Sequence, residues 1–369
     1  MYINLIKYPF KEIKFTVKNM VIETNITRML GIEHPIIAAP MGPFYTTKLS
    51  VAVSEAGGLG VLSHVTLHGT ISLDEMKKGM EYVVEHTDKP FGFNIRTATL
   101  QPDAIKLCRK IPQFIMDHPK IKEQCRLLIT SAGSPRMIMN KHFEALKESS
   151  EIQHFHVVPS LPLAEKVISQ GVDGIIATGK EGGGHQSYED ISTLVLLQQV
   201  TTKIPEIPVI ASGGFATGQG LASALAMGAG AIAMGSRFIA SKECEFHNNY
   251  KQVVKNSGVS DTKLITGVFG PARVWKNIHA EGESVVNSRV EKKSGETSIS
   301  DVNNSLKLLE EMYKGNIDKG TVLLGQSSGL IDKIECVSDI IDEIVIDAEN
   351  CLKNAYEMLK YKIKQEVIC

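Results

Sequence analysis

The chain has 369 residues, of which 43% are apolar and 22% charged, and its 40 basic and 41 acidic residues give a formal net charge of -1. This length is typical of two or three domains, or of one large α/β barrel with additions. The balanced charge disfavours general binding to nucleic acid or to an anionic membrane, and the composition excludes a mainly disordered chain.

No apolar run approaches the roughly 18 residues that span a bilayer. Lysines interrupt each apolar stretch of the first 19 residues, so we expect no signal peptide. The six cysteines are far apart, without a CxxC pair or zinc-ligand spacing, which is typical of reduced thiols and of a chain with no metal site. We therefore expect a cytoplasmic protein, with residues 1–24 as an N-terminal extension and a short helix beginning at Asn25.

From residue 35 to about residue 240, short apolar runs alternate with amphipathic stretches of helical length. We expect strands at Pro35–Ala39, Leu59–Ser63, Phe91–Ile95, Leu127–Thr130, Phe155–Val158, Gly174–Ala177, Pro208–Ala211 and Ala231–Met234. The expected helices between them are Asp74–His86, Ala104–Asp117, Pro135–Lys147, Leu163–Gln170, Ile191–Val200 and Gly218–Met227. Strands that are apolar throughout are typical of a parallel sheet with both faces covered.

Eight strands in strict alternation with helices predict a (β/α)8 barrel, which we place at residues 25–244. The alternative is an open doubly wound sheet, but no GxGxxG follows a first strand to support it. Residues 245–320 are more polar and show few strand signals, which favours a mainly helical lid over the barrel mouth; a separate solvated appendage is the alternative. Residues 321–369 contain a long amphipathic helix, whose apolar positions include Ile340 and Ile344, and we expect it to complete the barrel.

The ends of the last two barrel strands are rich in glycine. Strand seven ends in Ser212-Gly-Gly-Phe-Ala-Thr-Gly218, and strand eight ends in Met234-Gly-Ser-Arg-Phe238. Glycine lets backbone N–H groups approach an anion closely, and these two strand ends are the usual phosphate position of a (β/α)8 barrel. The pair predicts a phosphate site, although either segment alone could be a tight turn.

Other strand ends carry side chains suited to a planar ligand. Strand six is followed by Glu181-Gly-Gly-Gly-His185, where His185 could accept or donate a proton at neutral pH. Pro40 and Met41 offer an apolar platform, and Asn94 offers a donor and acceptors for the edge of a ring. A ring on a phosphate tether beside a histidine is the arrangement that flavin mononucleotide (FMN) would fit.

The ordered series of these motifs resembles the nitronate monooxygenase (2-nitropropane dioxygenase-like) family of FMN barrels, which also contains FMN-dependent enoyl-acyl-carrier-protein reductases. The resemblance runs from about Ile26 to Ala355 and includes Lys89-Pro-Phe-Gly-Phe-Asn-Ile95 and Gly325-Gln-Ser-Ser-Gly-Leu-Ile331. It implies that FMN is the cofactor and that His185 is the catalytic residue. It further implies that FMN is bound by Pro40, Met41, Asn94, Thr178, Gly183, Gly213, Gly214, Met234, Gly235 and Ser236.

This chain departs from the family pattern at three positions. Gly182 replaces the usual alanine of the motif before the histidine, and Ser236 replaces a frequent threonine while keeping the hydroxyl. Thr178 stands where Gln or Glu is more usual, which puts its contact with flavin in doubt.

The resemblance leaves two activities open. The first is oxidation of alkyl nitronates with O2, with His185 as base or substrate partner, which the Pro40-Met41 pair favours. The second is NAD(P)H-dependent reduction of an enoyl thioester or a quinone, which Ser131-Ala-Gly-Ser-Pro135 favours. A minor alternative is a flavin-free phosphate-binding lyase or isomerase, for which only Lys180 and Glu181 are at hand. We expect small-molecule partners and no nucleic acid or membrane, and a homodimer is left open.

Overall fold

The computed structural model describes residues 22–98, 101, 103–267, 270–283 and 299–359. Residues 1–21 of the expected N-terminal extension lie outside the described residues, and so do residues 360–369 of the expected C-terminal segment.

Eight parallel strands form one sheet in the order β1-β9-β8-β6-β5-β4-β3-β2. A bridge between Ile37 and Leu59 joins the two outer strands, so the sheet closes into a barrel. The (β/α)8 barrel predicted from the alternation is therefore confirmed, and each expected strand corresponds to an observed one. The strands are β1 (Ile36–Ala38), β2 (Gly60–Leu62), β3 (Phe91–Arg96), β4 (Cys125–Ser131), β5 (Gln153–Val158), β6 (Gly174–Thr178), β8 (Val209–Ser212) and β9 (Ala231–Met234).

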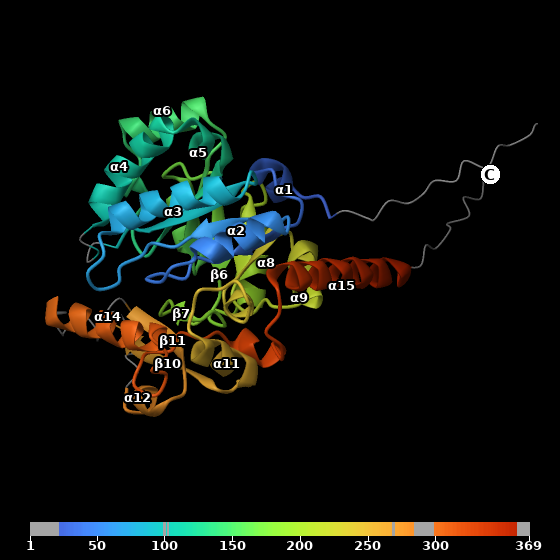
Figure 1. Ribbon diagram of the computed structural model, residues 1–369. Helices are drawn as coiled ribbons and strands as arrows, with labels where there is room; N and C mark the ends of the chain where they lie inside the picture. The colour runs from blue at the N-terminus through green and yellow to red at the C-terminus, as the bar shows by residue number, and fades with distance from the viewer. Residues whose placement is uncertain (1–21, 99–100, 102, 268–269, 284–298, 360–369) are drawn as a thin grey trace, which may run out of the picture.

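Helices surround the barrel and connect successive strands (Figure 1). They are α2 (Thr47–Glu55), α3 (Ser72–His86), α4 (Ala104–Asp117), α5 (Pro119–Gln124), α6 (Lys141–Ser149), α7 (Leu161–Ile168), α8 (Thr193–Lys203), α9 (Gly218–Ala226) and α10 (Ser236–Ile239). In the part of the chain that the structure describes, no helix is both long and apolar enough to cross a membrane.

One expected helix, Pro135–Lys147, is wrong in extent. The structure has a short 3-10 turn, η1 (Pro135–Met137), and starts α6 only at Lys141. Asn140 separates them, because its side chain accepts hydrogen bonds from the N–H groups of His142 and Phe143 and so caps α6.

The barrel interior is filled by one of the two alternating faces of each strand. Ile37 packs inside the barrel with Leu127 and Ile129, whereas the neighbouring Ile36 packs outward against the helices. The short helix α1 (Asn25–Leu30) contributes Ile26 and Leu30 to the same interior cluster.

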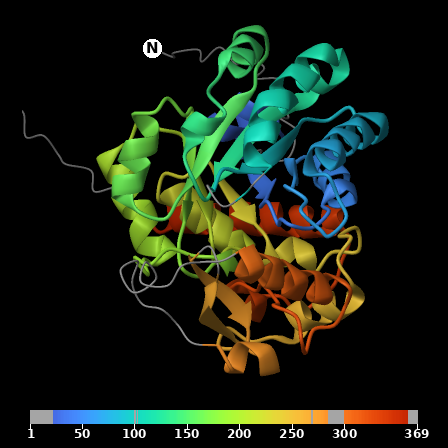
Figure 2. The same cartoon turned by 90° about the vertical axis from the view of Figure 1, so that its left-hand side faces the viewer.

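Residues 245–320 are here called the lid segment, and their described parts fold beside the barrel (Figures 1 and 2). Two antiparallel strands pair in its centre, and the second of them also pairs with β7, a two-residue strand from the loop after β6. The β-hairpin within the segment was not predicted, although helices make up more of its described residues than strands do. The described elements are α11 (Asn248–Asn256), β10 (Thr262–Gly267), β11 (Gly270–Trp275), α12 (Ile278–Glu281) and α14 (Ile299–Tyr313), and β7 is Gly184–His185.

The chain returns from the lid segment to the barrel through a 3-10 turn, η2 (Gln326–Leu330), and a long helix, α15 (Val337–Glu357), which packs against α9 and α2. Two carboxylates of the loop that joins the barrel to the lid segment accept hydrogen bonds from the first turns of two helices. Glu243 accepts a hydrogen bond from the N–H of Val337 at 3.0 Å, and Glu245 accepts one from the N–H of Lys48 at 2.5 Å. The loop thus ties α15 and α2 together at their N-termini.

Candidate active site

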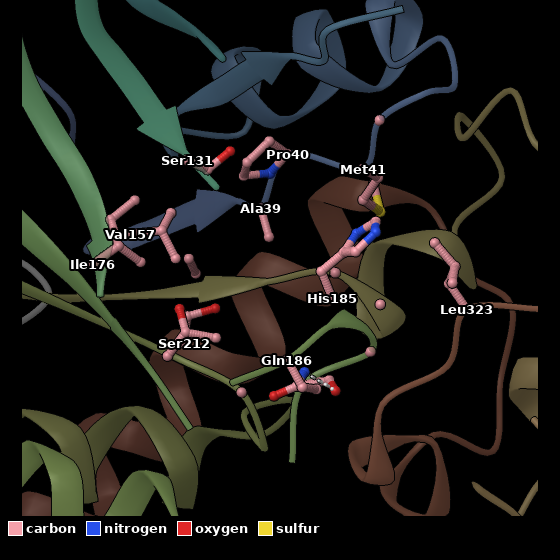
Figure 3. Close-up of a pocket in the computed structure, with 18 of the residues that line it drawn as sticks. Ala39, Pro40, Met41, Ser131, Val157, Ile176, His185, Gln186, Ser212 and Leu323 are labelled. Carbon is pink, nitrogen blue, oxygen red and sulfur yellow. Dashed lines mark hydrogen bonds between the residues drawn. The ribbon is translucent and has the colours of Figure 1, made fainter. Parts of the chain in front are cut away.

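A cavity of about 840 Å³ lies at the carboxyl ends of the barrel strands. Barrel residues form its floor, the glycine loop after β6 forms one wall, and Phe246, Tyr250 and Leu323 close it from the side of the lid segment. Figure 3 shows the side chains of Met41 and His185 facing each other across its mouth. Active sites of (β/α)8 barrels occupy this end of the fold.

The glycine loop is held in place by the lid segment. Gly184 and His185 pair as β7 with Arg273 and Ala272 of β11. A side chain at Gly183 would place its Cβ 2.7 Å from the backbone nitrogen of Gly325, so the two backbones approach as closely as glycine allows. His185 is therefore carried on paired backbone, and its exposed side chain lines the cavity.

Arg273 also fixes this loop, and the sequence offered no signal for it. Its Nε donates to the carbonyl of Lys180 at 2.7 Å, and its Nη1 donates to Thr262 Oγ1 at 3.1 Å. Burial lowers the pKa of Arg273. This buried cation joins the start of the glycine loop to both strands of the hairpin.

The side chains of Glu181 and Lys180 lie outside the cavity, where they could not act as the catalytic groups of a lyase. Glu181 Oε2 accepts hydrogen bonds from the N–H of Thr193 at 2.9 Å and from its hydroxyl at 2.8 Å. Lys180 Nζ lies 3.2 Å from Asp190 Oδ2, at the surface. Neither is among the residues that line the cavity, so the flavin-free alternative finds no side chain there for a Schiff base or a carboxylate base.

Backbone N–H groups gather where the sequence predicts a phosphate. Gly213 and Gly214 follow β8 with φ of +90° and +91°, and Gly235 and Ser236 follow β9. Within the described residues, the N–H groups of Gly214, Gly235 and Ser236 donate to no protein acceptor, although all three residues line the cavity. Unpaired amides on a concave wall fit the phosphate of FMN. We call these N–H groups, with that of Gly213, the phosphate cradle.

Of the other predicted site residues, Pro40, Met41, Asn94, Thr178 and Gly183 also line the cavity. Asn94 is buried, and its Nδ2 donates to the carbonyl of Ile129 at 2.9 Å and to Ser131 Oγ at 3.3 Å, so its amide oxygen is the acceptor that it can offer to a ligand. Met234 differs from the rest, because its side chain packs in the core and does not line the cavity. Its carbonyl accepts from the N–H of Ala39 at 3.0 Å instead.

Two histidines of β5 form a buried chain that was not predicted. Thr130 Oγ1 lies 2.8 Å from His154 Nε2 and 2.7 Å from His156 Nδ1, so one hydroxyl lies within hydrogen-bond distance of both rings. Burial lowers the pKa of His154 to about 3 and that of His156 to about 4, so both rings are neutral at pH 7. His156 lines the cavity floor. The sequence did carry a signal for this pair, because residues two apart in a strand, such as His154 and His156, lie on the same face.

The lid end of the cavity is aromatic. Phe44, Phe246 and Tyr250 are each at most 3% exposed and line the wall. Phe246 stacks on Tyr250 with ring centroids 5.6 Å apart and meets Phe44 edge-on at 5.1 Å. The hydroxyl of Tyr250 donates to the carbonyl of Leu323. Because this polar atom is satisfied within the protein, the wall offers an apolar surface to a ligand.

No group of three or more His, Cys, Asp or Glu side chains within the described residues could hold a metal ion.

Comparison with known proteins identifies relatives of the whole chain. A family model described as nitronate monooxygenase matches residues 23–347. A (3aS,4S,5R,7aS)-5-hydroxy-7a-methyl-1-oxo-octahydro-1H-indene-4-carboxyl-CoA dehydrogenase of Mycobacterium tuberculosis is 30% identical over 92% of this chain and 100% of its own. A nitronate monooxygenase of Paraburkholderia phytofirmans is 29% identical over 66% of this chain and 73% of its own. Among solved structures, FabK from Thermotoga maritima superposes with a TM-score of 0.76 at 32% identity, covering 91% of this chain and 99% of that one.

Proposed function

The chain belongs to the nitronate monooxygenase family, and from this premise we propose that it is an FMN-dependent oxidoreductase whose substrate is an acyl thioester. Family membership makes it an oxidoreductase with small-molecule substrates. The cofactor, the substrate and the residue roles below are our proposal.

The lining of the cavity supports FMN as the cofactor. The phosphate cradle after β8 and β9 would hold the phosphate through backbone N–H groups. Pro40, Met41 and Gly183 would lie along the ring, with Asn94 and Thr178 at its polar edge. The side chain of Met234 would support β9 from the core. When bound, FMN supplies hydride transfer to or from the substrate.

His185 is the side chain placed to move a proton. It lines the mouth of the cavity, where Met41 faces it, and the pairing of β7 with β11 fixes its backbone. An imidazole there can give a proton to, or take one from, the substrate carbon next to the thioester carbonyl. The lid segment and the glycine loop together exclude water from that carbon.

The observation that carries the thioester assignment is the size and lining of the cavity. A volume of about 840 Å³ is near the upper end of the roughly 300–1,000 Å³ range of ligand pockets. FMN occupies the floor, and the aromatic wall formed by Phe44, Phe246 and Tyr250 remains for a bulky apolar group. A small nitroalkane would leave that wall uncovered. The similarity to the indene-carboxyl-CoA dehydrogenase of M. tuberculosis over most of both chains supports the same choice, because the substrate in that name is a CoA thioester.

Oxidation of alkyl nitronates with O2 is the second candidate. One observation favours it: the cavity wall carries a cationic side chain, Arg96, and a nitronate is an anion. The similarity to the nitronate monooxygenase of P. phytofirmans also supports this candidate.

Anaerobic visible spectra of the purified protein test the proposal. We expect a flavin band near ~450 nm that bleaches with NADPH or NADH and returns when an enoyl thioester such as crotonyl-CoA is added. A band that nicotinamides leave unchanged but propyl-1-nitronate bleaches would replace the first candidate by the second. No band after reconstitution with FMN would reject both.

A further inference from the structure

The charge on the cavity wall is unusual. Among the described residues that line the cavity, Arg96 is the only Lys, Arg, Asp or Glu. Burial lowers the pKa of Arg96 only to about 10, so its guanidinium remains a cation at neutral pH. The wall of a large apolar cavity therefore holds one fixed positive charge.

Neutral groups hold this cation in place. Its Nη2 donates to Thr66 Oγ1 at 2.7 Å and to the carbonyl of His64 at 3.2 Å. The N–H of Arg96 donates to His64 Nδ1 at 3.1 Å, so the other ring nitrogen of His64 carries the proton and donates to Asp103 at 3.3 Å. Burial lowers the pKa of His64, which keeps that ring neutral.

The cation lacks a direct counter-ion. Within the described part of the chain, no carboxylate oxygen lies within 4 Å of the Arg96 guanidinium, and Asp103 instead accepts from His64 and from Gln101. The Nε of Arg96 is buried and has no hydrogen-bond partner among the residues that the structure describes. A buried charge with an unused donor is costly unless a ligand completes it. A ligand group beside the guanidinium would complete it.

The phosphate of FMN is not that group. In the closed strand order, β3 stands four strands from β8, which is directly across the barrel. Arg96 ends β3, whereas Gly213 and Gly214 follow β8. A phosphate on the cradle leaves Arg96 at the opposite wall.

We propose that Arg96 binds a planar two-oxygen anion on the substrate, because a guanidinium presents paired donors to such a group. Two substrates could carry it: a thioester whose acyl group bears a carboxylate, or an alkyl nitronate. The identity of the carrier depends on the proposed function, whereas the anion site itself does not.

Binding of benzoate and of the uncharged benzamide tests the site directly. Calorimetry is run on protein with and without FMN, so the result stands even if the flavin assignment fails. We expect benzoate to bind the unchanged protein at least about 10-fold more tightly than benzamide, and Arg96→Met to abolish that preference. Arg136→Met is the control: it removes an exposed arginine outside the cavity, so this variant should keep the preference for benzoate over benzamide.

Equal binding of benzoate and benzamide by the unchanged protein would overturn the proposal, and so would a preference that survives Arg96→Met. If Arg96→Met unfolds, Arg96→Lys replaces it, since a lysine keeps the charge but not the paired donors. We then expect a several-fold weaker preference for benzoate. An unchanged preference in Arg96→Lys would reject paired donation by the guanidinium and thus the two-oxygen geometry.

Kinetics with three substrates identify the carrier. If the acyl group bears the anion, Arg96→Met should raise the KM of glutaconyl-CoA, which has a terminal carboxylate, by about 10-fold or more and leave that of crotonyl-CoA unchanged. If the nitronate is the anion, the KM of propyl-1-nitronate should rise instead. Equal KM values in both proteins for all three substrates would overturn the proposal, whereas absence of turnover by the unchanged protein would reject only the proposed function.

Discussion

The carboxylate of Glu181 accepts a hydrogen bond from the backbone N–H of Thr193 at 2.9 Å, so a residue of the glycine loop caps the first turn of α8. The charge also lies at the positive end of the helix dipole. Glu181 is thus a structural partner of α8, although it stands four residues before His185.

We therefore expect Glu181→Gln to lower the free energy of unfolding by about 0.5–2 kcal/mol, the usual effect of losing a charged cap. Any loss of turnover should come from displacement of the glycine loop alone, so the pH profile of turnover should not change. Urea unfolding and kcat/KM against pH measure both effects. Glu165→Gln, on the exposed face of α7, is the control. Loss of one limb of the pH profile would make Glu181 an acid–base group and contradict its capping role.

His185→Ala should retain FMN but reduce turnover by about 10²–10⁴, which is the usual contribution of a positioned acid–base group. The backbone pairing of β7 with β11 does not need the imidazole, so the loop should keep its place. Flavin content and steady-state rates are the measurements, with His86→Ala on the exposed end of α3 as control. Turnover equal to that of the unchanged protein would remove His185 from the mechanism.

Gly214→Asp should lose FMN, because a carboxylate would be introduced beside the phosphate cradle. Gly171→Asp is a matched control: Gly171 has φ of +88°, close to the +91° of Gly214, and a Cβ there meets nothing within 4 Å. Both variants carry the same backbone strain, so only the first should lower the FMN-to-protein ratio. Stoichiometric FMN in Gly214→Asp would show that the phosphate binds elsewhere.

Stability should fall as the pH drops below about 6.5. In the unfolded chain His154 and His156 take up protons near their ordinary pKa of about 6.5, whereas in the folded protein burial lowers these pKa values to about 3 and 4. The unfolded state then binds more protons, so the free energy of unfolding decreases with falling pH. His64, whose pKa burial also lowers, acts in the same direction.

The predicted slope approaches about 1.4 kcal/mol per pH unit for each such histidine between pH 6 and 5. Urea unfolding from pH 8 to 5 measures it. His156→Gln should reduce the slope, whereas His86→Ala should leave it unchanged, because that side chain is exposed. A stability independent of pH over this range would contradict the assignment of neutral buried rings.

The barrel could be predicted from the sequence because its strands are short, apolar and regularly spaced. Phe91–Ile95 and Ala231–Met234 need no partner from elsewhere in the chain to be recognised, since burial on both faces leaves a continuous apolar run. The glycine-rich strand ends were equally readable, because few functions other than close backbone approach favour consecutive glycines.

The features that were missed depend on contacts between distant segments. Thr262–Gly267 has only two buried positions, three residues apart, so it lacks the alternation typical of a strand and becomes one through pairing with β11. In the sequence Arg96 follows an apolar run, and a charged residue in that position is typical of a strand end that faces solvent. Only the fold shows that it lies on a cavity wall and that no carboxylate among the described residues lies within 4 Å of it.

The two helix-capping carboxylates, Glu243 and Glu245, have a consequence for exchanging parts between relatives. Glu243 lies just before the lid segment and Glu245, two positions later, is its first residue, yet they hold α15 and α2, which belong to the barrel. A transplant that cuts the chain after residue 245 keeps both anchors with the recipient barrel, whereas one that cuts before residue 243 imports foreign anchors. Chimeras that carry only the lid should therefore fold more readily than chimeras that carry the junction as well.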